Sequence, residues 1–324
     1  MKTPILKLTV PEIERGTRLD IFCSHRVEGY SRSHFTKLAT SGHITIDGKA
    51  AKASHKVKPG QVIELELVSP PPTEALPENI PLNIVYEDDY LLVINKPADM
   101  VCHPAAGNYA GTLVNGLLYY FSRLKEFSDK IRPGLVHRLD KDTSGLLVVA
   151  KDEKTLRELQ LSLKNRLIKR QYIALVWGTM PQPEGIIDLP MGRSESDRKK
   201  MKVFGAKSRE AMTNYEVLKS YSIAELVRLK LQTGRTHQIR VHLSYFGNPV
   251  VGDSTYGGRS KAVTKLSGPK RRLGLSLLRT INRQALHAWN LGFDHPATGE
   301  KINLTCEPPE DFQKTVELLE GFEE

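Results

Sequence analysis

The spacing of apolar residues over positions 17–68 predicts a small module that begins with two helices. One apolar-periodic helix opens at Thr17, and a second is expected over Arg32–Thr40. Ser31 is well placed to cap the start of the second helix, and Gly42 can end it with a left-handed residue. Both boundaries of the second helix therefore have a local chemical cause.

The second helix is predicted to bury one face and expose the other. Phe35 and Leu38 fall on the inward face, which leaves Arg32, Thr36 and Lys37 toward solvent. A basic exposed helix is either an ordinary solvated face or a surface for nucleic acid. The pattern alone does not decide between these two interpretations.

Alternating apolar and polar residues predict the strands that complete the module. Ile44–Ile46 alternates in this way and runs into Asp47-Gly48, which is a strong hairpin signal. Val62–Leu67 has the same alternation and would close the module. Residues 1–16 precede it and are predicted to form a lead-in strand.

A proline-rich segment separates this module from the rest of the chain. Five prolines fall within residues 69–81, and such a density prevents regular structure and favours a semi-extended spacer. The predicted organisation is a lead-in strand at 1–16, a small domain at 17–68, a linker at 69–81, a larger domain at 82–311 and an acidic tail at 312–324, which is expected to form a solvated helix.

The larger domain alternates between strand and helix patterns. In chain order the pattern predicts two short strands within 82–97, a helix over 112–121, a buried strand at 146–150, a helix capped by Asp152, strands at 171–178 and 225–231, and a helix that Thr236 would cap and that would end near Gly247.

Composition adds a preference for a polyanionic partner. The chain has 324 residues and a formal net charge of +10, which favours nucleic acid or an anionic membrane surface. A membrane is disfavoured because no apolar run approaches about 18 residues and the N-terminus does not resemble a signal peptide. Cys23, Cys102 and Cys306 form no CxxC pair, so buried thiols and a reducing cytoplasm are expected.

The stretch Gly134–Gly145 concentrates the polar chemistry of the larger domain. His137, Arg138 and Asp140 lie within four residues of one another, and an Asp-Thr-Ser-Gly turn then leads into the apolar run 146–150. This order predicts a loop that presents polar groups and then enters a buried strand. The simplest interpretation is a polar turn in which Arg138 and Asp140 pair with each other or with nearby backbone groups.

A second polar stretch, Thr233–Arg240, has the sequence Thr-Gly-Arg-Thr-His-Gln-Ile-Arg and leads into a helix. Its histidines raise the question of a metal site. His237 and His242 are five residues apart, which is wrong for a helical HExxH site, and neither a cysteine nor a carboxylate set completes one. No metal site is therefore predicted.

Three separated motifs resemble those of the RluA family of RNA pseudouridine synthases. Residues 137–145 are similar to the family's active-site motif and residues 233–240 to its third motif. Residues 95–97 with 102–104 are similar to its first motif, although Asp99 stands where members commonly have Gly; Asp tolerates a positive φ better than most residues. Residues 283–288 also resemble a late signature of the family.

The resemblance extends to the N-terminal module, and it carries a fold with it. Residues 17–68 are similar to the αL RNA-binding domain, whose recognition helix would be the one with Arg32 and Lys37. The implied fold is α+β, with this small αL domain followed by a pseudouridine synthase catalytic domain that has a mixed, mainly antiparallel sheet. The pattern is closest to RluD-type members, which act on large-subunit ribosomal RNA.

The resemblance also implies a reaction. The family breaks the N1–C1′ bond of uridine and rejoins the base through C5, an isomerisation that requires no cofactor and no metal. Asp140 would be the catalytic residue in its ionised form, and whether it attacks the base, attacks C1′ or removes the C2′ proton stays open. Arg240 would pair with Asp140 through a charge-assisted bond, and whether that bond is bidentate stays open. Tyr172 would stack on the uracil, and Arg170 stands two residues earlier, where the family usually has Lys.

The remaining implied contacts are with RNA. Arg138 would enter the RNA where the target nucleotide is flipped out, and an unpaired uridine is the expected target because flipping costs a few kcal/mol. The other predicted RNA-binding residues are His137, Arg235, Arg32, Lys37 and Lys96. Residues 193–209 are strongly basic. The acid-free stretch 254–293, where Arg283 is one of eight cations, is expected to contact phosphates. The expected partner is ribosomal RNA, with transfer RNA as the alternative, and the expected state is a monomer.

Two other classes of function are compatible with part of the pattern. A non-catalytic RNA-binding ribosome-assembly factor would explain the charge but would leave the set of Asp140, Tyr172 and Arg240 without a purpose. A hydrolytic glycosidic enzyme would need a second placed carboxylate. Asp142 is only two residues from Asp140 and is expected to turn outward.

Overall fold

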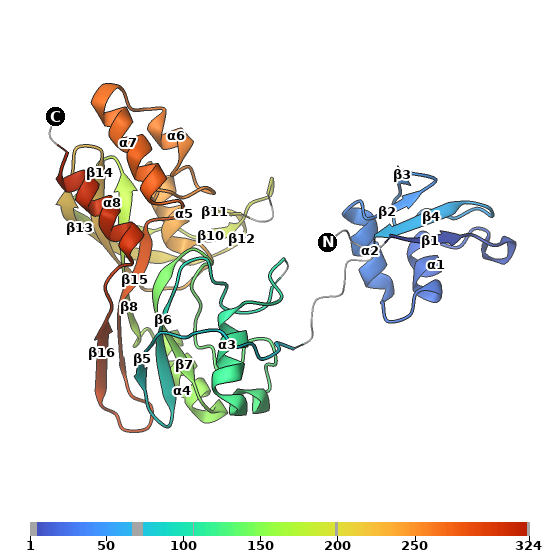
Figure 1. Ribbon diagram of the computed structural model, residues 1–324, viewed down its shortest axis with the longest axis horizontal. Helices are drawn as coiled ribbons and strands as arrows, with labels where there is room; N and C mark the ends of the chain where they lie inside the picture. The colour runs from blue at the N-terminus through green and yellow to red at the C-terminus, as the bar shows by residue number, and fades with distance from the viewer. Residues whose placement is uncertain (1–4, 67–73, 106, 198–199, 323–324) are drawn as a thin grey trace. The chain divides into compact units, whose positions relative to one another are not determined.

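The computed structural model describes residues 5–66, 74–105, 107–197 and 200–322, and the chain divides into two compact units, residues 1–72 and 73–324 (Figure 1). Each unit has a hydrophobic core of its own. No helix in the described ranges is long and apolar enough to span a membrane.

The first unit packs two helices against a small antiparallel sheet with the strand order β1-β4-β2-β3. Its elements are β1 (Ile5–Thr9), α1 (Leu19–Arg26), α2 (Arg32–Thr40), β2 (Ile44–Ile46), β3 (Lys49–Ala50) and β4 (Val62–Glu66), with a 3-10 turn at Glu12–Glu14. A strand forms within the predicted lead-in segment 1–16, as β1, and it pairs with β4 along its whole length. Val10 is buried in the same core, so this segment is part of the module.

The predicted boundaries of α2 are confirmed. The Ser31 hydroxyl accepts a hydrogen bond from the His34 backbone N–H, and Gly42 has a φ of 80°. Phe35 and Leu38 are buried while Arg32 and Lys37 are exposed, as the helical spacing predicts.

The proline-rich spacer divides differently from the prediction for 69–81. Residues 67–73 lie outside the described residues. Beyond them, the Ala75 backbone N–H donates to the carbonyl of Lys130, the Asn115 side chain donates to the Leu76 carbonyl, and the Glu78 N–H donates to the Asn115 carbonyl. Backbone groups in this proline-rich stretch have no partners within a helix or sheet, so they pair with the second unit and attach residues 75–78 to it.

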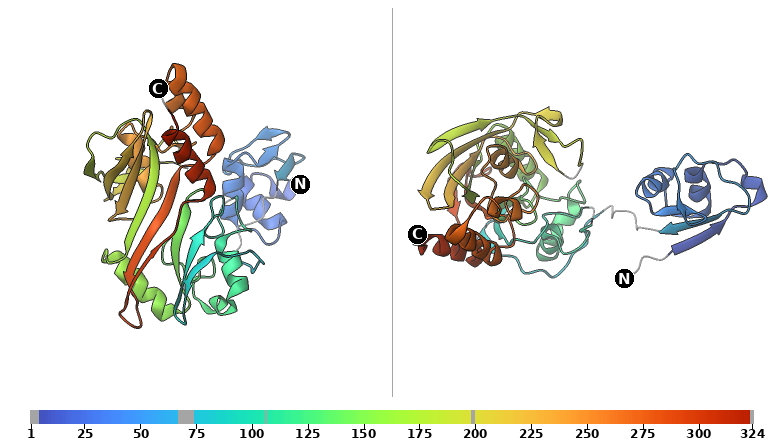
Figure 2. Two further views of the ribbon diagram at one scale, coloured as in Figure 1. Left: turned by 60° about the vertical axis from the view of Figure 1, so that its left-hand side comes forward. Right: turned by 90° about the horizontal axis from the view of Figure 1, so that it is seen from above.

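The second unit is built on a sheet that has nine strands in the described ranges, in the order β5-β6-β7-β15-β8-β14-β13-β9, with β16 beside β15 (Figure 2). The strands are β5 (Ile84–Glu87), β6 (Leu91–Lys96), β7 (Ser144–Ala150), β8 (Lys169–Trp177), β9 (Glu184–Asp188), β13 (Met212–Ser220), β14 (Ala224–Leu231), β15 (Leu286–Asp294) and β16 (Lys301–Thr305). Among these pairs only β7 and β15 run parallel. The sheet is therefore mixed and mainly antiparallel, which confirms the predicted fold class.

Helices and a small second sheet cover this core. They are α3 (Leu113–Tyr120), a 3-10 helix at Ser122–Glu126, α4 (Glu153–Lys164), α5 (Gln238–Tyr245), α6 (Ser260–Val263), α7 (Gly268–Thr280) and α8 (Glu310–Glu320), with β10 (Met191–Arg193), β11 (Met201–Val203) and β12 (Ala206–Arg209) forming the small sheet. The Asp152 carboxylate caps α4 as predicted, accepting from the backbone N–H groups of Lys154 and Thr155.

The start of α5 differs from the prediction. Its N-cap is His237 rather than Thr236, and His237 has a left-handed backbone with a φ of 57°. No side chain caps this helix; instead the Gln238 amide oxygen accepts from the Arg235 N–H and the Thr233 hydroxyl. This local network decides the entry geometry, and a search for a Ser or Thr cap does not find it.

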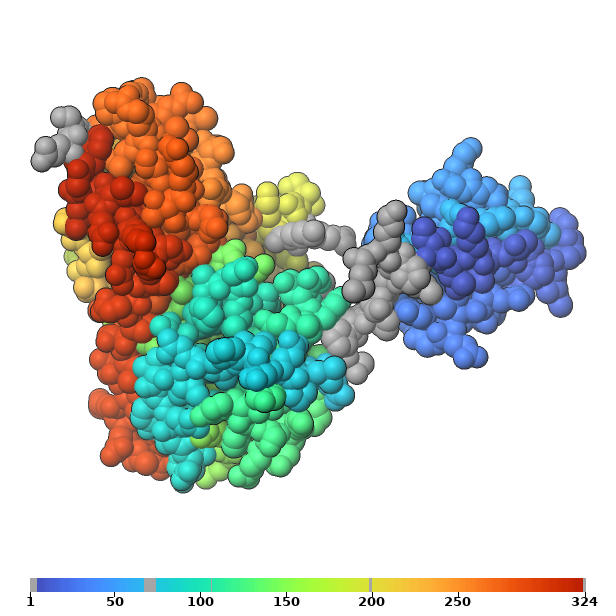
Figure 3. Space-filling view, viewed as in Figure 1, coloured from blue at the N-terminus to red at the C-terminus, as the bar shows by residue number. Residues whose placement is uncertain are grey.

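The C-terminal helix is also a correction. The predicted helix exists as α8, but Phe312 and Leu319 are buried in the main core, so it is not simply solvated. Figure 3 shows α8 (red) beside α7 (orange) on the surface of this unit. Arg283, which was predicted to contact phosphate, is buried instead. It makes two hydrogen bonds of 2.7 Å to Asp311, which lies in the first turn of α8.

Candidate active site

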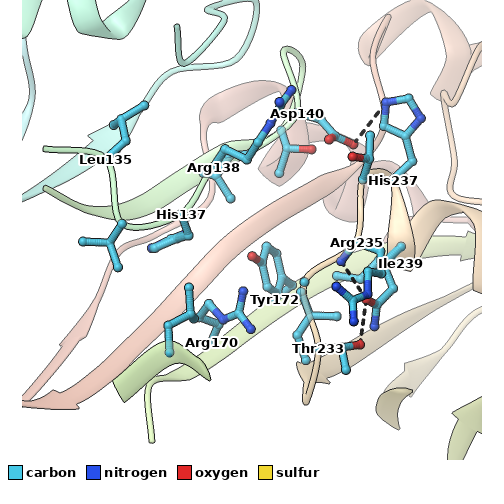
Figure 4. Close-up of a pocket in the computed structure, with 18 of the residues that line it drawn as sticks. Leu135, His137, Arg138, Asp140, Arg170, Tyr172, Thr233, Arg235, His237 and Ile239 are labelled. Atoms are coloured by element: carbon cyan, nitrogen blue, oxygen red, sulfur yellow. Dashed lines mark hydrogen bonds and ion pairs between the residues drawn. The ribbon is translucent and has the colours of Figure 1, made fainter. Parts of the chain in front are cut away.

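A pocket of about 670 Å³ opens in the second unit between the loop that precedes β7, the strand β8 and the loop that precedes α5 (Figure 4). Its lining includes Asp140, Tyr172, Arg235 and Arg240. Residues 100 positions apart in the sequence therefore share one hollow. The pocket contains most of the site residues that the sequence predicts.

Asp140 is held at the pocket by the turn that starts β7. The Thr143 N–H donates to the Asp140 carbonyl, and the chain then enters the fully buried strand. Gly145 permits this entry because its φ is +115° and an added Cβ would lie 2.3 Å from the Ala288 carbonyl oxygen on β15. The close parallel approach of β7 to β15 thus fixes where Asp140 emerges.

Arg240 bonds to Asp140 through a single N–H, so this pair is not bidentate. Its Nη1 donates to Asp140 Oδ2 at 3.0 Å, while Nε and Nη2 donate to the two carboxylate oxygens of Asp253 at 2.7 and 3.0 Å. The bidentate partner is therefore Asp253. Burial lowers the pKa of Arg240, but the bonds to Asp253 and then to Asp140 outweigh it, so the pKa is raised and the guanidinium stays charged.

Asp253 is a site residue that the sequence reasoning missed. It is 0% exposed, and besides Arg240 it accepts from the backbone N–H groups of Thr255 and Tyr256. An Asp that bonds the N–H groups two and three residues later is a common turn pattern. The run Gly-Asp-Ser-Thr-Tyr-Gly around Asp253 could have indicated this turn. The pairing with Arg240 depends on the tertiary fold.

His237 faces Asp140 from the other side of the pocket. Its Nδ1 is hydrogen-bonded to the Tyr256 hydroxyl at 2.7 Å, and that hydroxyl also accepts from the Met201 N–H. Its Nε2 lies 4.0 Å from Asp140 Oδ2. Burial lowers the pKa of His237 and favours the neutral form of the ring.

Tyr172 lies on the pocket floor on β8 and is 5% exposed. Burial raises the pKa of its hydroxyl, so the ring is neutral. Arg170 and Tyr172 are two positions apart on this strand and both line the pocket, as the period of a β-strand requires. The predicted position of Tyr172 beside Asp140 is therefore consistent with the geometry.

Comparison with known proteins identifies the chain. The model of the S4 domain matches residues 17–63, and that of RNA pseudouridylate synthase matches residues 90–245. An uncharacterized RNA pseudouridine synthase of Bacillus subtilis (strain 168) is 39% identical over 314 residues, which cover 97% of this chain and 98% of that protein. The chain belongs to the RluA family of RNA pseudouridine synthases.

Other relatives of the synthase have more specific names. Ribosomal large subunit pseudouridine synthase D of Pseudomonas aeruginosa is 42% identical over 94% of this chain and 92% of its own, and RNA pseudouridine synthase 2, chloroplastic, of Arabidopsis thaliana is 40% identical over 93% and 80%. The structure of Human RNA Pseudouridylate Synthase Domain Containing 4 covers 74% of the synthase and 93% of its own chain, with 28% identity and a TM-score of 0.56. The synthase is thus an isomerase with an N-terminal RNA-binding S4 domain.

Two predicted RNA-binding residues of the central motif lie at the pocket in different ways. Arg138 is exposed, and its Nη1 donates to His103 Nε2 at 3.3 Å. His137 accepts a hydrogen bond from the Val148 N–H through Nε2, and burial lowers its pKa to about 3. His137 is therefore a neutral residue of the pocket wall rather than a cation that could pair with phosphate.

Lys96 is a correction, because it is 0% exposed and cannot reach RNA. Its ammonium donates to the backbone carbonyls of Pro97, Met100 and Lys141, which ties the first-motif loop to the loop beside Asp140. The loop also contains Asp99, whose φ of 63° confirms the expected positive φ. Burial lowers the pKa of Lys96 to about 8. Lys96 therefore has a structural role.

The other predicted RNA contacts differ in how firmly they are held. Arg235 lines the pocket, and its Nε donates to the Glu210 carbonyl at 2.9 Å. In the S4 domain Arg32 Nε donates to the buried carboxylate of Asp20 at 3.0 Å, while the side chain remains 55% exposed. Lys37 is exposed on the same helix. These three cations remain predicted RNA contacts.

Proposed function

We propose that this synthase isomerises uridine in large-subunit ribosomal RNA and that Asp140 is its catalytic carboxylate. The observation that supports this role is the ion pair with Arg240, which sits in a pocket floored by Tyr172. The choice of RNA is supported by the relatives named ribosomal large subunit pseudouridine synthase D, including those of Xanthomonas campestris and Pseudomonas aeruginosa. The net charge of +10 suits a long polyanion.

In the proposed mechanism the N1–C1′ bond breaks, the uracil rotates and the C5–C1′ bond forms. N1 gains a proton and C5 loses its hydrogen to solvent, so no group donor is required. Asp140 acts in its ionised form and accepts a charge-assisted hydrogen bond from Arg240 Nη1. Tyr172 stacks on the uracil, and Arg138 occupies the space in the RNA that the flipped nucleotide leaves.

Asp253 is the structural reason why Arg240 is available in this geometry. Nε and Nη2 of the guanidinium are bound by one buried carboxylate, which orients the group so that Nη1 donates to Asp140 in the pocket. Asp140 therefore receives one directed bond from a cation that is held in place from behind. Lysine has a single ammonium and could not serve both carboxylates in this way.

The hydrolytic alternative is disfavoured by the same contacts. A pair of catalytic carboxylates would both have to reach the substrate. Asp253 is 0% exposed and its oxygens are taken by Arg240 and two backbone N–H groups, so it cannot act on a sugar. The non-catalytic assembly factor would not require a buried Arg240 aimed at a pocket carboxylate. We propose that the synthase acts as a monomer in the cytoplasm, where its three buried, unpaired cysteines would stay reduced.

The test is incubation of the synthase with unmodified transcripts that contain C5-tritiated uridine. Large-subunit ribosomal RNA should release tritium and yield pseudouridine without free uracil, while transfer RNA should react more slowly. Asp140→Asn should abolish the release with RNA affinity nearly intact, because the isosteric amide cannot act as a nucleophile or base. Activity of this variant within about tenfold of wild type, or about 1.4 kcal/mol, would refute the assignment.

A further inference from the structure

Arg170 is a buried cation in the pocket that the mechanism does not use. It is 8% exposed, and its Nε has no hydrogen-bond partner among the described residues. It forms no ion pair with a described carboxylate either, in contrast to Arg240 and Arg283. A guanidinium has five N–H donors and no acceptor, and its burial without acceptors is unfavourable. Such a group is expected to meet an acceptor when the pocket is occupied.

His137 presents a second unsatisfied donor beside Arg170 (Figure 4). Its Nε2 accepts from the Val148 N–H at 3.4 Å, so the proton of the neutral ring lies on Nδ1. That Nδ1 is buried and also has no partner among the described residues. Burial and the charge of Arg170 both hold the pKa of His137 low, which keeps it a neutral donor.

The pocket reserves space for the Arg170 guanidinium. A Cβ added to Gly234 would lie 2.8 Å from Arg170 Nη1. Because φ of Gly234 is not in the left-handed region, an alanine there would be free of backbone strain and would act by displacing the end of the Arg170 side chain. The loop before α5 thus leaves room for an unpaired guanidinium at the side of Tyr172.

We propose that Arg170 and His137 form a subsite that binds a carbonyl oxygen of the target pyrimidine. The proposal rests on the proposed function, in which the base stacks on Tyr172. Two residues along a strand span about 6.6 Å, which is comparable to the width of a pyrimidine with its exocyclic oxygens. A base over Tyr172 therefore brings one carbonyl toward Arg170, and one oxygen with two lone pairs can accept from both donors.

This subsite also accounts for a choice of base. Rotation of uracil about the N3···C6 axis exchanges N1 with C5 and, with them, O2 with O4. The same two donors therefore meet a carbonyl oxygen before and after the rotation. Cytosine has a carbonyl on one side of N3 and an amino group on the other, so in one orientation two donors would face a third. Unpaired donors of this kind give strong discrimination between similar ligands.

The test is an internal competition between uridine and thiouridine in one RNA pool. Transcripts of large-subunit ribosomal RNA are made with about one uridine in ten replaced by 4-thiouridine, or in a second pool by 2-thiouridine. Sulfur is a weak acceptor, and the competition cancels effects on RNA folding. Conversion of each nucleoside is measured by chromatography after digestion, for wild type, Arg170→Met, Gly234→Ala and the control Arg157→Met, which removes an exposed arginine on α4.

Wild type and Arg157→Met should prefer uridine over at least one thiouridine by about tenfold, a part of one charge-assisted hydrogen bond. Arg170→Met should react more slowly and should lose that preference. Gly234→Ala should lose it too while retaining the charge, which keeps the test valid if Arg170→Met does not fold. Equal preference in wild type and both pocket variants, or none in wild type, would overturn the proposal and is the result expected if Arg170 binds phosphate. Failure of the proposed function differs, because wild type would then convert neither nucleoside.

Discussion

Arg240 is bonded to two carboxylates with different exposures, and this asymmetry allows its effects on stability and on activity to be separated. Asp253 is 0% exposed, whereas the Asp140 side chain is 18% exposed and faces the pocket. Arg240→Met removes the shared partner of both carboxylates at once. The stranded Asp253 should then dominate the loss of stability, and the unpartnered Asp140 should dominate the loss of rate.

The magnitudes follow from the contacts. Breaking a buried ion pair by removing one partner costs about 3–5 kcal/mol, so Arg240→Met should lose that much free energy of unfolding. The double variant Arg240→Met/Asp253→Asn no longer buries an unpaired charge and should recover about 1–3 kcal/mol of it. The rate should not recover. Loss of one charge-assisted bond to Asp140 is about 1.5–3 kcal/mol, which corresponds to a rate about 10- to 150-fold lower in both variants.

The two readouts can be taken on the intact synthase. Its two tryptophans, Trp177 and Trp289, lie on β8 and β15, so urea unfolding followed by tryptophan fluorescence reports on the catalytic unit. Single-turnover rates at saturating RNA report on the chemistry. Arg157→Met is the control, because this arginine is exposed on α4 and its replacement should change stability by less than about 0.5 kcal/mol. If the rate of the double variant rises together with its stability, Arg240 acts on activity only through folding and the proposed pairing role is wrong.

Three further predictions concern other charged groups. Lys96→Met should destabilise the catalytic unit by about 2 kcal/mol without changing the salt dependence of RNA binding, whereas Lys37→Met should lower the salt slope by about 1, and equal slopes for both would contradict this assignment. The hydrogen bond from Arg18 lowers the pKa of Asp20 to about 2, below its ordinary 3.8, so Asp20 stabilises the S4 domain above about pH 4 and this contribution is lost as pH falls toward 2. The pKa shift alone corresponds to about 2 kcal/mol of stability, but Arg18 and Arg32 are 40% and 55% exposed, so solvent screening should reduce this to about 1 kcal/mol. Asp20→Asn should remove the pH dependence of the protection of α1 and α2 against hydrogen exchange. Deletion of residues 1–72 should weaken RNA affinity but leave single-turnover activity at saturating RNA, and a folded yet inactive product would show that the S4 domain has a catalytic role.

Local chemistry was sufficient to predict much of the fold. The Ser31 cap, the left-handed Gly42 and the Asp152 cap act on groups within a few residues, and each was predicted with the right boundary. Motif spacing likewise led to the family, because a run such as residues 137–145 is specific without knowledge of its neighbours. The sequence therefore determined the secondary structure of the S4 domain and the identity of the central loop.

Tertiary structure decided which charged groups are available to a ligand. Lys96 and Arg283 carry the positive charge expected of RNA contacts. Lys96, however, is fully buried against three carbonyls, and Arg283 is bound to Asp311 on α8. The bidentate partner of Arg240 is Asp253, and no feature of the sequence around Asp253 indicates that pairing. The sequence does not show whether a charged side chain is buried or exposed. The two carboxylates that Arg240 contacts lie 13 and 100 positions from it, so only the packed structure could show that Asp253 holds the guanidinium from one side while Nη1 donates to Asp140.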